Sequence, residues 1–147
     1  MKQRSLSPSF VDFIPPTLDE GVLYISIRYR TASHLCACGC GFKATTPIRP
    51  PQWHLYFDGD AVSLWPSVGS WQFPCRSHYW IKGNAIRWCE PWTEEQIAAG
   101  RKRDADDVQR YFESMDSKLN LGTLQDVDVD AKASTVLRFW KRMRRSR

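Results

Sequence analysis

The stretch His34-Leu-Cys-Ala-Cys-Gly-Cys-Gly41 places three cysteines, Cys36, Cys38 and Cys40, at every second position. Side chains at alternate positions of an extended chain point to one face, and residues two apart lie about 7 Å apart along a strand. The glycines between and after the cysteines permit left-handed backbone conformations, so a turn there would bring the sulfurs together. The spacing therefore predicts a site at which thiolates share a metal ion.

A fourth cysteine, Cys75, lies in the later segment Phe73-Pro-Cys-Arg-Ser-His-Tyr-Trp80. Four thiolates usually hold a tetrahedral zinc ion, with sulfur about 2.3 Å from the metal. An alternative ligand set replaces one of the clustered cysteines with His78, which forms a Cys-x-x-His pair with Cys75. The fifth cysteine, Cys89, is expected to be packed rather than metal-bound. The preferred ligands of a structural Zn²⁺ are Cys36, Cys38, Cys40 and Cys75.

The composition is that of a folded domain. The chain has 147 residues, 13% of them aromatic, including seven tryptophans, which is enough to build a core. No apolar run approaches the roughly 18 residues of a membrane span, and residues 1–10 lack the apolar segment of a secretory signal. We therefore expect a cytoplasmic protein without membrane partners, in which five cysteines indicate a metal site rather than disulfides.

The net charge of +5 is unevenly distributed. Residues 138–147 contain six basic side chains and no acid, which leaves the rest of the chain close to neutral. A basic tail on a neutral domain does not indicate a nucleic-acid-binding fold, although the tail itself leaves such a contact open.

The pattern of short segments predicts an α+β fold, with a small zinc-stapled antiparallel β domain over residues 11–92 after a flexible N-terminus at residues 1–10. Apolar and polar residues alternate over 22–29, as in a half-buried strand. The sequence Asp58-Gly-Asp60 between two aromatic, β-branched runs predicts a hairpin. A domain this small gains stability from a metal staple.

The residue pattern after Pro91 is typical of helices. Thr93-Glu-Glu-Gln96 is a capping-box sequence, and it predicts a helix over residues 93–116. Gly122 and alternating aspartates predict a linker that begins near residue 117. A basic C-terminal helix from about residue 131 completes the predicted unit 117–147, with its apolar residues on one side.

A closed four-thiolate zinc has no open coordination position, so chemistry must come from groups beside it. Ser77 lies two residues after Cys75, and His34 lies two residues before Cys36. If both segments are extended, each side chain shares the face of its ligand, and the two can meet. A serine and a histidine in contact are the minimum for nucleophilic acyl chemistry, because the hydroxyl needs a base.

Two alternatives concern the partners in this pair. His78 adjoins Ser77 and would point the other way in a strand, although a loop could reverse it. Ser67 is a competing nucleophile in the predicted tight loop Pro66-Ser-Val-Gly69, where the glycine could expose backbone amides to an oxyanion.

Two other classes of function remain open. A zinc hydrolase with an open metal site would use His34 or His78 among its ligands and Asp19 or Glu20 as base. A non-enzymatic zinc module would bind a conjugation enzyme, or a phage or DNA partner, through its aromatic face or its basic tail.

The same residues resemble a small bacterial family of domains of unknown function. The resemblance covers roughly residues 10–100. It rests on Leu18-Asp-Glu-Gly-Val-Leu-Tyr-Ile-Ser26, His34-x-Cys-x-Cys-Gly-Cys-Gly41, Trp53, Asp58-Gly59 and Pro66-Ser-x-Gly-x-Trp-x-Phe-Pro-Cys-Arg-Ser-His-Tyr-Trp-Ile81. Members of this family occur in operons for ubiquitin-like protein conjugation of the Bub type.

The resemblance implies a deconjugating or processing peptidase with a serine–histidine dyad, acting in bacterial antiphage defence. It implies a ubiquitin-like protein and its conjugates as substrates, with E1-like and E2-like proteins as further partners. Carried over to this chain, Ser77 with His34 or His78 would form the dyad. The cysteines would form the zinc site. The family usually has glutamate at the first acidic position, where this chain has Asp19.

Overall fold

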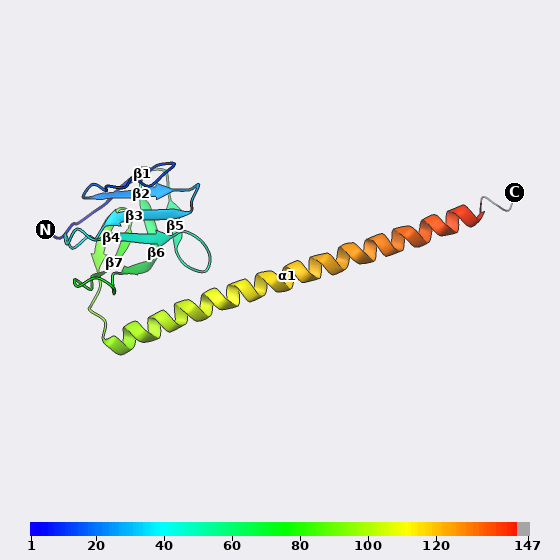
Figure 1. Ribbon diagram of the computed structural model, residues 1–147. Coiled ribbons are helices and arrows are strands. Elements are labelled where there is room, and N and C mark those ends of the chain that lie inside the picture. Colours follow the sequence, from blue (N-terminus) through cyan, green and yellow to red (C-terminus); the bar gives the residue numbers. More distant parts are fainter. Residues whose placement is uncertain (144–147) are drawn as a thin grey trace. The chain divides into compact units, whose positions relative to one another are not determined.

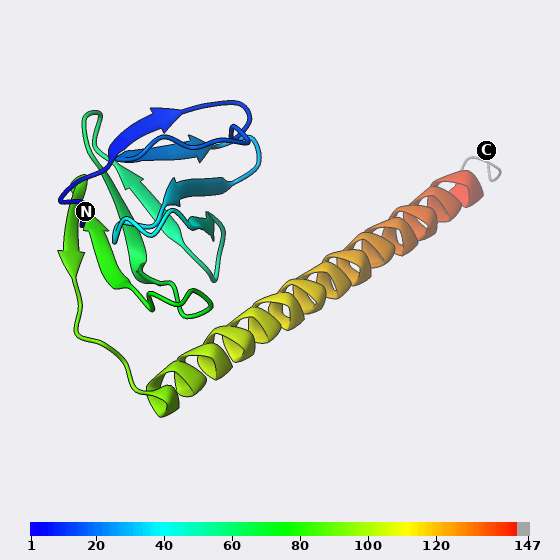
Figure 2. The ribbon, with the colours of Figure 1, turned by 60° about the vertical axis from the view of Figure 1, so that its left-hand side comes forward.

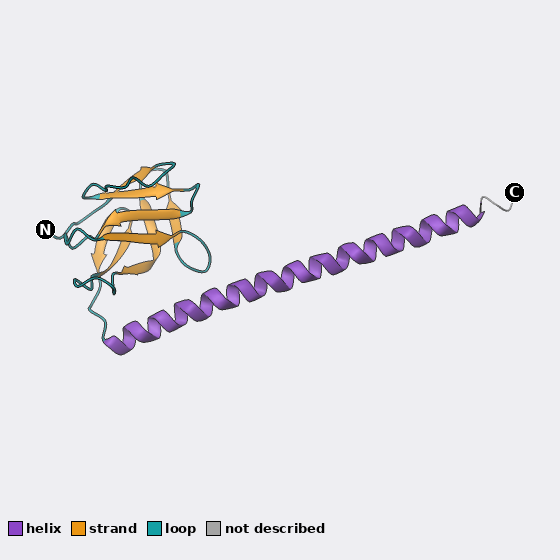
Figure 3. Cartoon of the chain, viewed as in Figure 1, coloured by secondary structure: helices purple, strands orange, loops and turns teal. Residues whose placement is uncertain are grey.

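The computed structural model describes the backbone of residues 1–143 and the side-chain surroundings of residues 1–119. The chain divides into two compact units, Met1–Val108 and Gln109–Arg147. Within the described residues, eight strands are followed by one helix, so the predicted α+β class is confirmed (Figure 3).

The strands form two four-stranded sheets. The first has the order β1-β2-β3-β4, and its strands are β1 (Ser7–Phe10), β2 (Val22–Ser26), β3 (Thr31–Leu35) and β4 (Lys43–Pro47). The second has the order β5-β6-β7-β8, with β5 (His54–Phe57), β6 (Val62–Gly69), β7 (His78–Lys82) and β8 (Ala85–Trp88). β1 pairs with β2 in parallel, and the other neighbours are antiparallel, including the predicted hairpin of β5 and β6.

The two sheets pack face to face, as the two ribbon views show (Figures 1 and 2). One apolar cluster contains fully buried residues of both sheets, among them Leu23 and Ile25 of β2 and Leu64 and Ile81 of the second sheet. Burying side chains of this size contributes about 1.5–3 kcal/mol each, so this shared core is what holds the sheets together.

Side chains along β7 alternate between the core and the outer side of the second sheet. Tyr79 and Ile81 are fully buried in the core between the sheets. His78 and Trp80 take the opposite parity and therefore face the outer side of the second sheet. Two neighbouring residues of this strand can thus contribute to different sites.

β6 is irregular at the point where it passes His78. Leu64 pairs with Ile81 and Val68 pairs with Tyr79, so the register shifts between these two pairs. Three residues of β6, numbers 65–67, therefore stand opposite one residue of β7, which is a β-bulge. Pro66 contributes to the interruption because it has no backbone N–H to donate. The segment predicted as a tight loop is thus a bulged part of a strand.

The N-terminal residues are more ordered than predicted. Leu6 is buried, with 1% exposure, and its N–H donates a hydrogen bond to the carbonyl oxygen of Asn84 at 2.8 Å. β1 follows directly and pairs with β2. The polar composition of residues 1–10 gave no indication of a strand. β1 is stabilised by backbone pairing rather than by apolar side chains.

The helix also differs from its prediction. The capping box is confirmed, because Thr93 N–H donates to Gln96 Oε1 at 2.9 Å and Gln96 N–H donates to Thr93 Oγ1 at 3.3 Å. Helix α1 (Glu94–Met143) then continues through residues 117–130, where a linker was predicted. No proline follows Pro91, and one glycine in a helix costs only about 1 kcal/mol. Within the described residues, no helix combines the length and apolar character needed to cross a bilayer.

Candidate active site and candidate metal centre

Four cysteines lie together at one end of the two sheets. Cys36 directly follows β3, and Cys38 and Cys40 lie in the turn after it, while Cys75 comes from the loop between β6 and β7. All four sulfur atoms lie within 4.8 Å of one another. Gly39 and Gly41 have φ angles of +82° and +78°, so the turn that gathers the sulfurs uses backbone conformations that favour glycine.

The sulfur positions fit a tetrahedral metal. A tetrahedron with sulfur about 2.3 Å from its centre has S–S edges of about 3.8 Å. The Sγ–Sγ distances are 3.5 Å for Cys36–Cys38, 3.9 Å for Cys36–Cys75 and 3.6 Å for Cys40–Cys75. The four-sulfur donor set is typical of a structural zinc site. His78 and the carboxylates of Asp19 and Glu20 are not members of this group.

The acid–base properties of the thiols also favour a cation. Burial raises the pKa of Cys36, and burial together with nearby thiols raises that of Cys40 to about 12. Burial acts in the same direction on Cys38, but hydrogen bonds from Ser77 and neighbouring thiols outweigh it and lower the pKa to about 6. One thiolate thus forms readily while its neighbours resist ionisation, a conflict that a bound dication would relieve.

The structure places Ser77 and His34 in the interior, but not against each other. Ser77 is buried, and its hydroxyl lies within hydrogen-bonding reach of Cys36 and Cys38. His34 is fully buried, and its Nε2 lies 2.8 Å from the hydroxyl of Tyr79. Within the part of the chain that the structure describes, no hydrogen bond joins Ser77 to a histidine. Burial lowers the pKa of His34 to about 4, which makes it a weak base near neutral pH.

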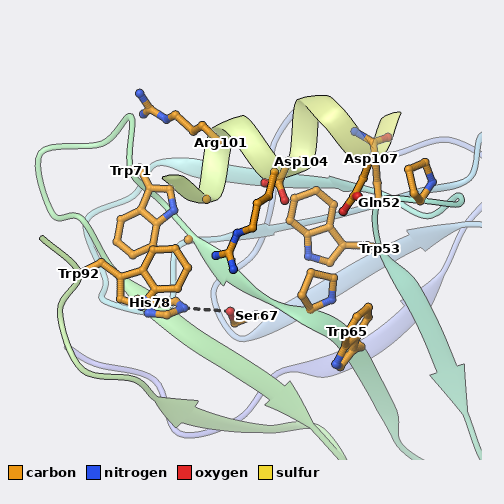
Figure 4. A pocket seen from close by; sticks show the side chains of 15 residues that line it. Gln52, Trp53, Trp65, Ser67, Trp71, His78, Trp92, Arg101, Asp104 and Asp107 are labelled. Atoms are coloured by element: carbon orange, nitrogen blue, oxygen red, sulfur yellow. Dashed lines mark hydrogen bonds between the residues drawn. The ribbon is translucent and has the colours of Figure 1, made fainter. Parts of the chain in front are cut away.

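Ser67 and His78 form the serine–histidine pair of the structure. Ser67 Oγ lies 2.9 Å from His78 Nε2, across the bulge of β6 (Figure 4). The other ring nitrogen of His78, Nδ1, lies 3.4 Å from the carbonyl oxygen of Glu90. A histidine that donates from Nδ1 to a carbonyl presents an unprotonated Nε2, which can accept the serine proton. Ser67 with His78 therefore has the geometry of a nucleophile and its base.

Two tryptophans that stack on each other both contact the ring of His78. The ring centroids of Trp71 and Trp92 lie 5.0 Å and 4.9 Å from that of His78, and the two indoles stack on each other at 5.2 Å with an interplanar angle of 15°. Trp71 also packs on the backbone of Gly69, where a Cβ atom would lie 2.3 Å from the indole nitrogen. Gly69 is needed here for close approach and not for its φ angle.

The pair opens into a pocket of about 500 Å³ within the first compact unit (Figure 4). Aromatic side chains dominate its walls, and Trp53 and Trp65 lie across from His78 and Trp92 (Figure 4). The first turns of α1 add charged side chains of both signs, namely Arg101, Arg103, Asp104 and Asp107. An apolar pocket with a few convergent polar groups and a nucleophile–base pair is the usual form of an active site.

Asp19 and Glu20, the two candidate catalytic bases of the metal mechanism, lie outside this site. Asp19 Oδ2 accepts a hydrogen bond from the hydroxyl of Tyr24 at 2.7 Å, and Glu20 is exposed. Neither lines the pocket that contains Ser67 and His78. This arrangement does not favour a metal-bound water activated by Asp19 or Glu20.

Sequence reasoning missed several residues of this site. Ser67 and His78 were both candidates, with the choice of serine and of histidine left open, but the preferred pair was Ser77 with His34 or His78. Trp71, Trp92 and the residues of α1 were not considered. A usable signal was present in Pro66-Ser-Val-Gly-Ser-Trp71, because a serine between proline and glycine is exposed by backbone irregularity.

Comparison with known proteins supports a protease. Comparisons with curated proteins and with solved structures gave no match. The family model described as "Bacterial ubiquitination-like system serine protease (BubE)" matches residues 10–89, which include both members of the Ser67–His78 pair and the four clustered cysteines. The match covers more than half of the chain, so this protein belongs to the BubE family of serine proteases of bacterial ubiquitination-like systems.

Proposed function

We propose that this protein is a peptidase that cleaves after the C-terminal residue of a ubiquitin-like modifier, with Ser67 as nucleophile and His78 as general base. The observation that carries the proposal is the 2.9 Å contact between Ser67 Oγ and His78 Nε2 in a pocket. Family membership supports a serine protease, and Ser67 is the serine that has a histidine partner among the described residues.

The proposed reaction has two halves. Ser67 Oγ attacks the carbonyl carbon of the scissile bond while His78 Nε2 takes the hydroxyl proton. The C–N bond then breaks, and His78 returns that proton to the leaving amine. Water subsequently attacks the acyl-enzyme, with His78 again as base, and releases the modifier with a free carboxylate and a neutral Ser67. The same steps would cleave an oxyester, with an alcohol as leaving group.

In this scheme the backbone carbonyl of Glu90 acts as the third group, which orients the histidine. By accepting from His78 Nδ1 it favours the tautomer with a free Nε2, and it stabilises the imidazolium that forms after proton transfer. At 3.4 Å this contact is long for a hydrogen bond. The aromatic rings that contact His78 therefore contribute more to the orientation of its imidazole.

The four cysteines would hold a structural zinc ion, which would supply a cross-link between the turn after β3 and the loop before β7. Cys75 lies three residues before His78. The cysteines would therefore fix the entry of β7, and so the position of His78, without taking part in proton transfer.

The substrates proposed are a ubiquitin-like protein and its conjugates, because the family acts in a ubiquitination-like system. Contact with E1-like or E2-like proteins of such a system and a role in antiphage defence are extensions of the same proposal. The cytoplasm is the proposed compartment, because it keeps clustered thiols reduced and able to bind metal.

A matched pair of serine variants tests the nucleophile. Wild type, Ser67→Ala and Ser77→Ala would be compared for cleavage of a ubiquitin-like protein fused to a reporter, and for labelling by a fluorophosphonate probe located by mass spectrometry. We expect Ser67→Ala to lose cleavage at least about a thousandfold and to lose the adduct. Ser77→Ala should keep both when loaded with metal. An adduct on Ser77, or full activity of Ser67→Ala, would disprove the assignment.

A further inference from the structure

Trp92 contacts the proposed catalytic histidine from outside the family-matched region. The family model ends at residue 89, and Trp92 lies between β8 and the start of α1. Its ring meets that of His78 edge to face, with centroids 4.9 Å apart and an interplanar angle of 67°. Trp92 also stacks on Trp71, with ring centroids 5.2 Å apart.

The first turns of α1 hold Trp92 in this position. Gly100 of the helix lies so close that a Cβ atom there would approach Cζ3 of Trp92 to 2.9 Å. The same turns are anchored to the first compact unit, because Ile97 is buried with 4% exposure. Arg76 and Glu94 also form an ion pair that connects the Cys75 loop to the start of the helix. Trp92 is therefore confined between the helix, Trp71 and His78.

We propose that Trp92, backed by Gly100, is a positioning residue that keeps the His78 imidazole aligned between the Glu90 carbonyl and Ser67. This inference rests on the proposed function of the Ser67–His78 pair. It extends the active site beyond residues 10–89 into the start of α1.

Trp92 matters because few other contacts fix the orientation of the His78 ring. The contact of His78 Nδ1 with Glu90 is 3.4 Å long, and hydrogen bonds of that length are weak. Rotation of the ring about its Cβ–Cγ bond would move Nε2 away from Ser67. The stacked pair of indoles that contacts the ring resists this rotation, since edge-to-face contacts have a preferred geometry. Without Trp92, His78 would spend less time in the reactive orientation.

Variants of the full chain test this role. Trp92→Ala should lower kcat about ten- to a hundredfold with a smaller change in KM, and Trp92→Phe should restore most of it. Gly100→Ala favours the helix by intrinsic propensity, yet its Cβ would displace Trp92, so we expect lower kcat without lower thermal stability. Trp88→Phe is the matched control, because Trp88 contacts Tyr79 instead of His78 and its loss should leave kcat unchanged.

A second readout does not depend on activity. Long-range ¹H–¹⁵N NMR of the histidine rings reports the tautomer of His78, one of three histidines in the chain. We expect a dominant Nδ1–H form in wild type and a mixture in Trp92→Ala and Gly100→Ala. If Ser67→Ala cleaves normally, the proposed function fails, while the NMR experiment still tests Trp92.

The positioning role would be overturned if folded Trp92→Ala and Gly100→Ala keep both the wild-type tautomer and the wild-type kcat. If Trp92→Ala does not fold, Gly100→Ala carries the test alone, and a wild-type tautomer with wild-type kcat in that variant overturns the role. A loss of kcat in Trp88→Phe equal to that in Trp92→Ala would likewise count against a specific role.

Discussion

Ser77 and His78 are consecutive in the chain, but their side chains belong to different sites. β7 begins at this point, with the cysteine cluster on one side of it and the pocket on the other. The Ser77 hydroxyl lies against the clustered thiols, and the His78 ring lies against Ser67. One change of side between adjacent residues thus separates the candidate metal centre from the candidate dyad.

Ser77→Ala should weaken metal binding and leave chemistry intact. A hydrogen bond to a charged group contributes about 1.5–3 kcal/mol, so loss of the Ser77 hydroxyl should lower zinc affinity roughly ten- to a hundredfold. Competition with a chromophoric chelator would measure this affinity. Ser67→Ala is the control and should bind zinc as the wild type does. Unchanged affinity in Ser77→Ala would mean that the hydroxyl does not support the thiolates.

Removal of the metal should destabilise the first compact unit. Chelation, or Cys36→Ser, is expected to lower the melting temperature and the activity together, because structural zinc contributes directly to folding free energy. Cys89→Ser serves as the control, since Cys89 lies outside the group of four. Elemental analysis should give one zinc per chain in Cys89→Ser and less in Cys36→Ser. Equal metal content in the two variants would contradict the ligand assignment.

Tyr79→Phe should cost stability rather than catalysis. The hydroxyl of Tyr79 bonds His34 Nε2 at 2.8 Å and accepts from the N–H of Ala37 at 3.4 Å. Leaving buried polar groups unpaired costs about 1–3 kcal/mol, which urea denaturation would measure. The folded fraction should keep the wild-type kcat. A large fall in kcat with unchanged stability would instead implicate His34 in the reaction.

Gly69→Ala should damage the active site while the sheets stay folded. The added methyl group would overlap the indole of Trp71, and Trp71 packs on His78. We expect kcat to fall about tenfold or more by displacement of the base, with little change in circular dichroism. A fully active Gly69→Ala would show that Trp71 can move without moving His78.

A chain that ends after residue 118 should retain catalysis. The residues that line the pocket extend no further than Asp107, and the first compact unit ends at Val108. Cleavage of the fusion substrate by the shortened chain would be compared with that by the full chain at equal zinc content. A higher KM with unchanged kcat would assign substrate recruitment to residues 119–147, and a loss of kcat would contradict the expectation.

Much of the fold could be predicted from local pattern. The hairpin at Asp58-Gly59, the capping box at Thr93 and the gathering of the four cysteines all depend on short-range chemistry, and all three are present in the structure. β1 escaped prediction because its sequence, Ser-Pro-Ser-Phe, lacks the alternation of apolar and polar residues that marks a strand. The continuation of the helix was not predicted, because the alternating aspartates indicated a linker although no proline interrupts the segment.

The Ser67–His78 pair was harder to predict for a physical reason. Face-sharing along an extended segment led to the pairing of Ser77 with His34, but Ser77 lies against the thiols and His34 bonds Tyr79 instead. It could not reveal that the bulge of β6 carries Ser67 towards His78, because a register shift is a property of two paired strands. The walls formed by Trp71 and Trp92 depend on tertiary packing, which no single segment encodes.

The bulge has a consequence for the dynamics of β6. Amides of regular ladder pairs such as Leu64–Ile81 and Val68–Tyr79 are protected from hydrogen exchange until larger openings occur. Between them, Trp65 still pairs with His54 of β5, whereas Pro66 and Ser67 have no partner in the register with β5 or with β7, so local fluctuations of these two residues are less costly. The proposed nucleophile thus lies on a short compliant stretch between two rigid ones, which lets its hydroxyl adjust to a tetrahedral intermediate while the sheet beneath it stays in place.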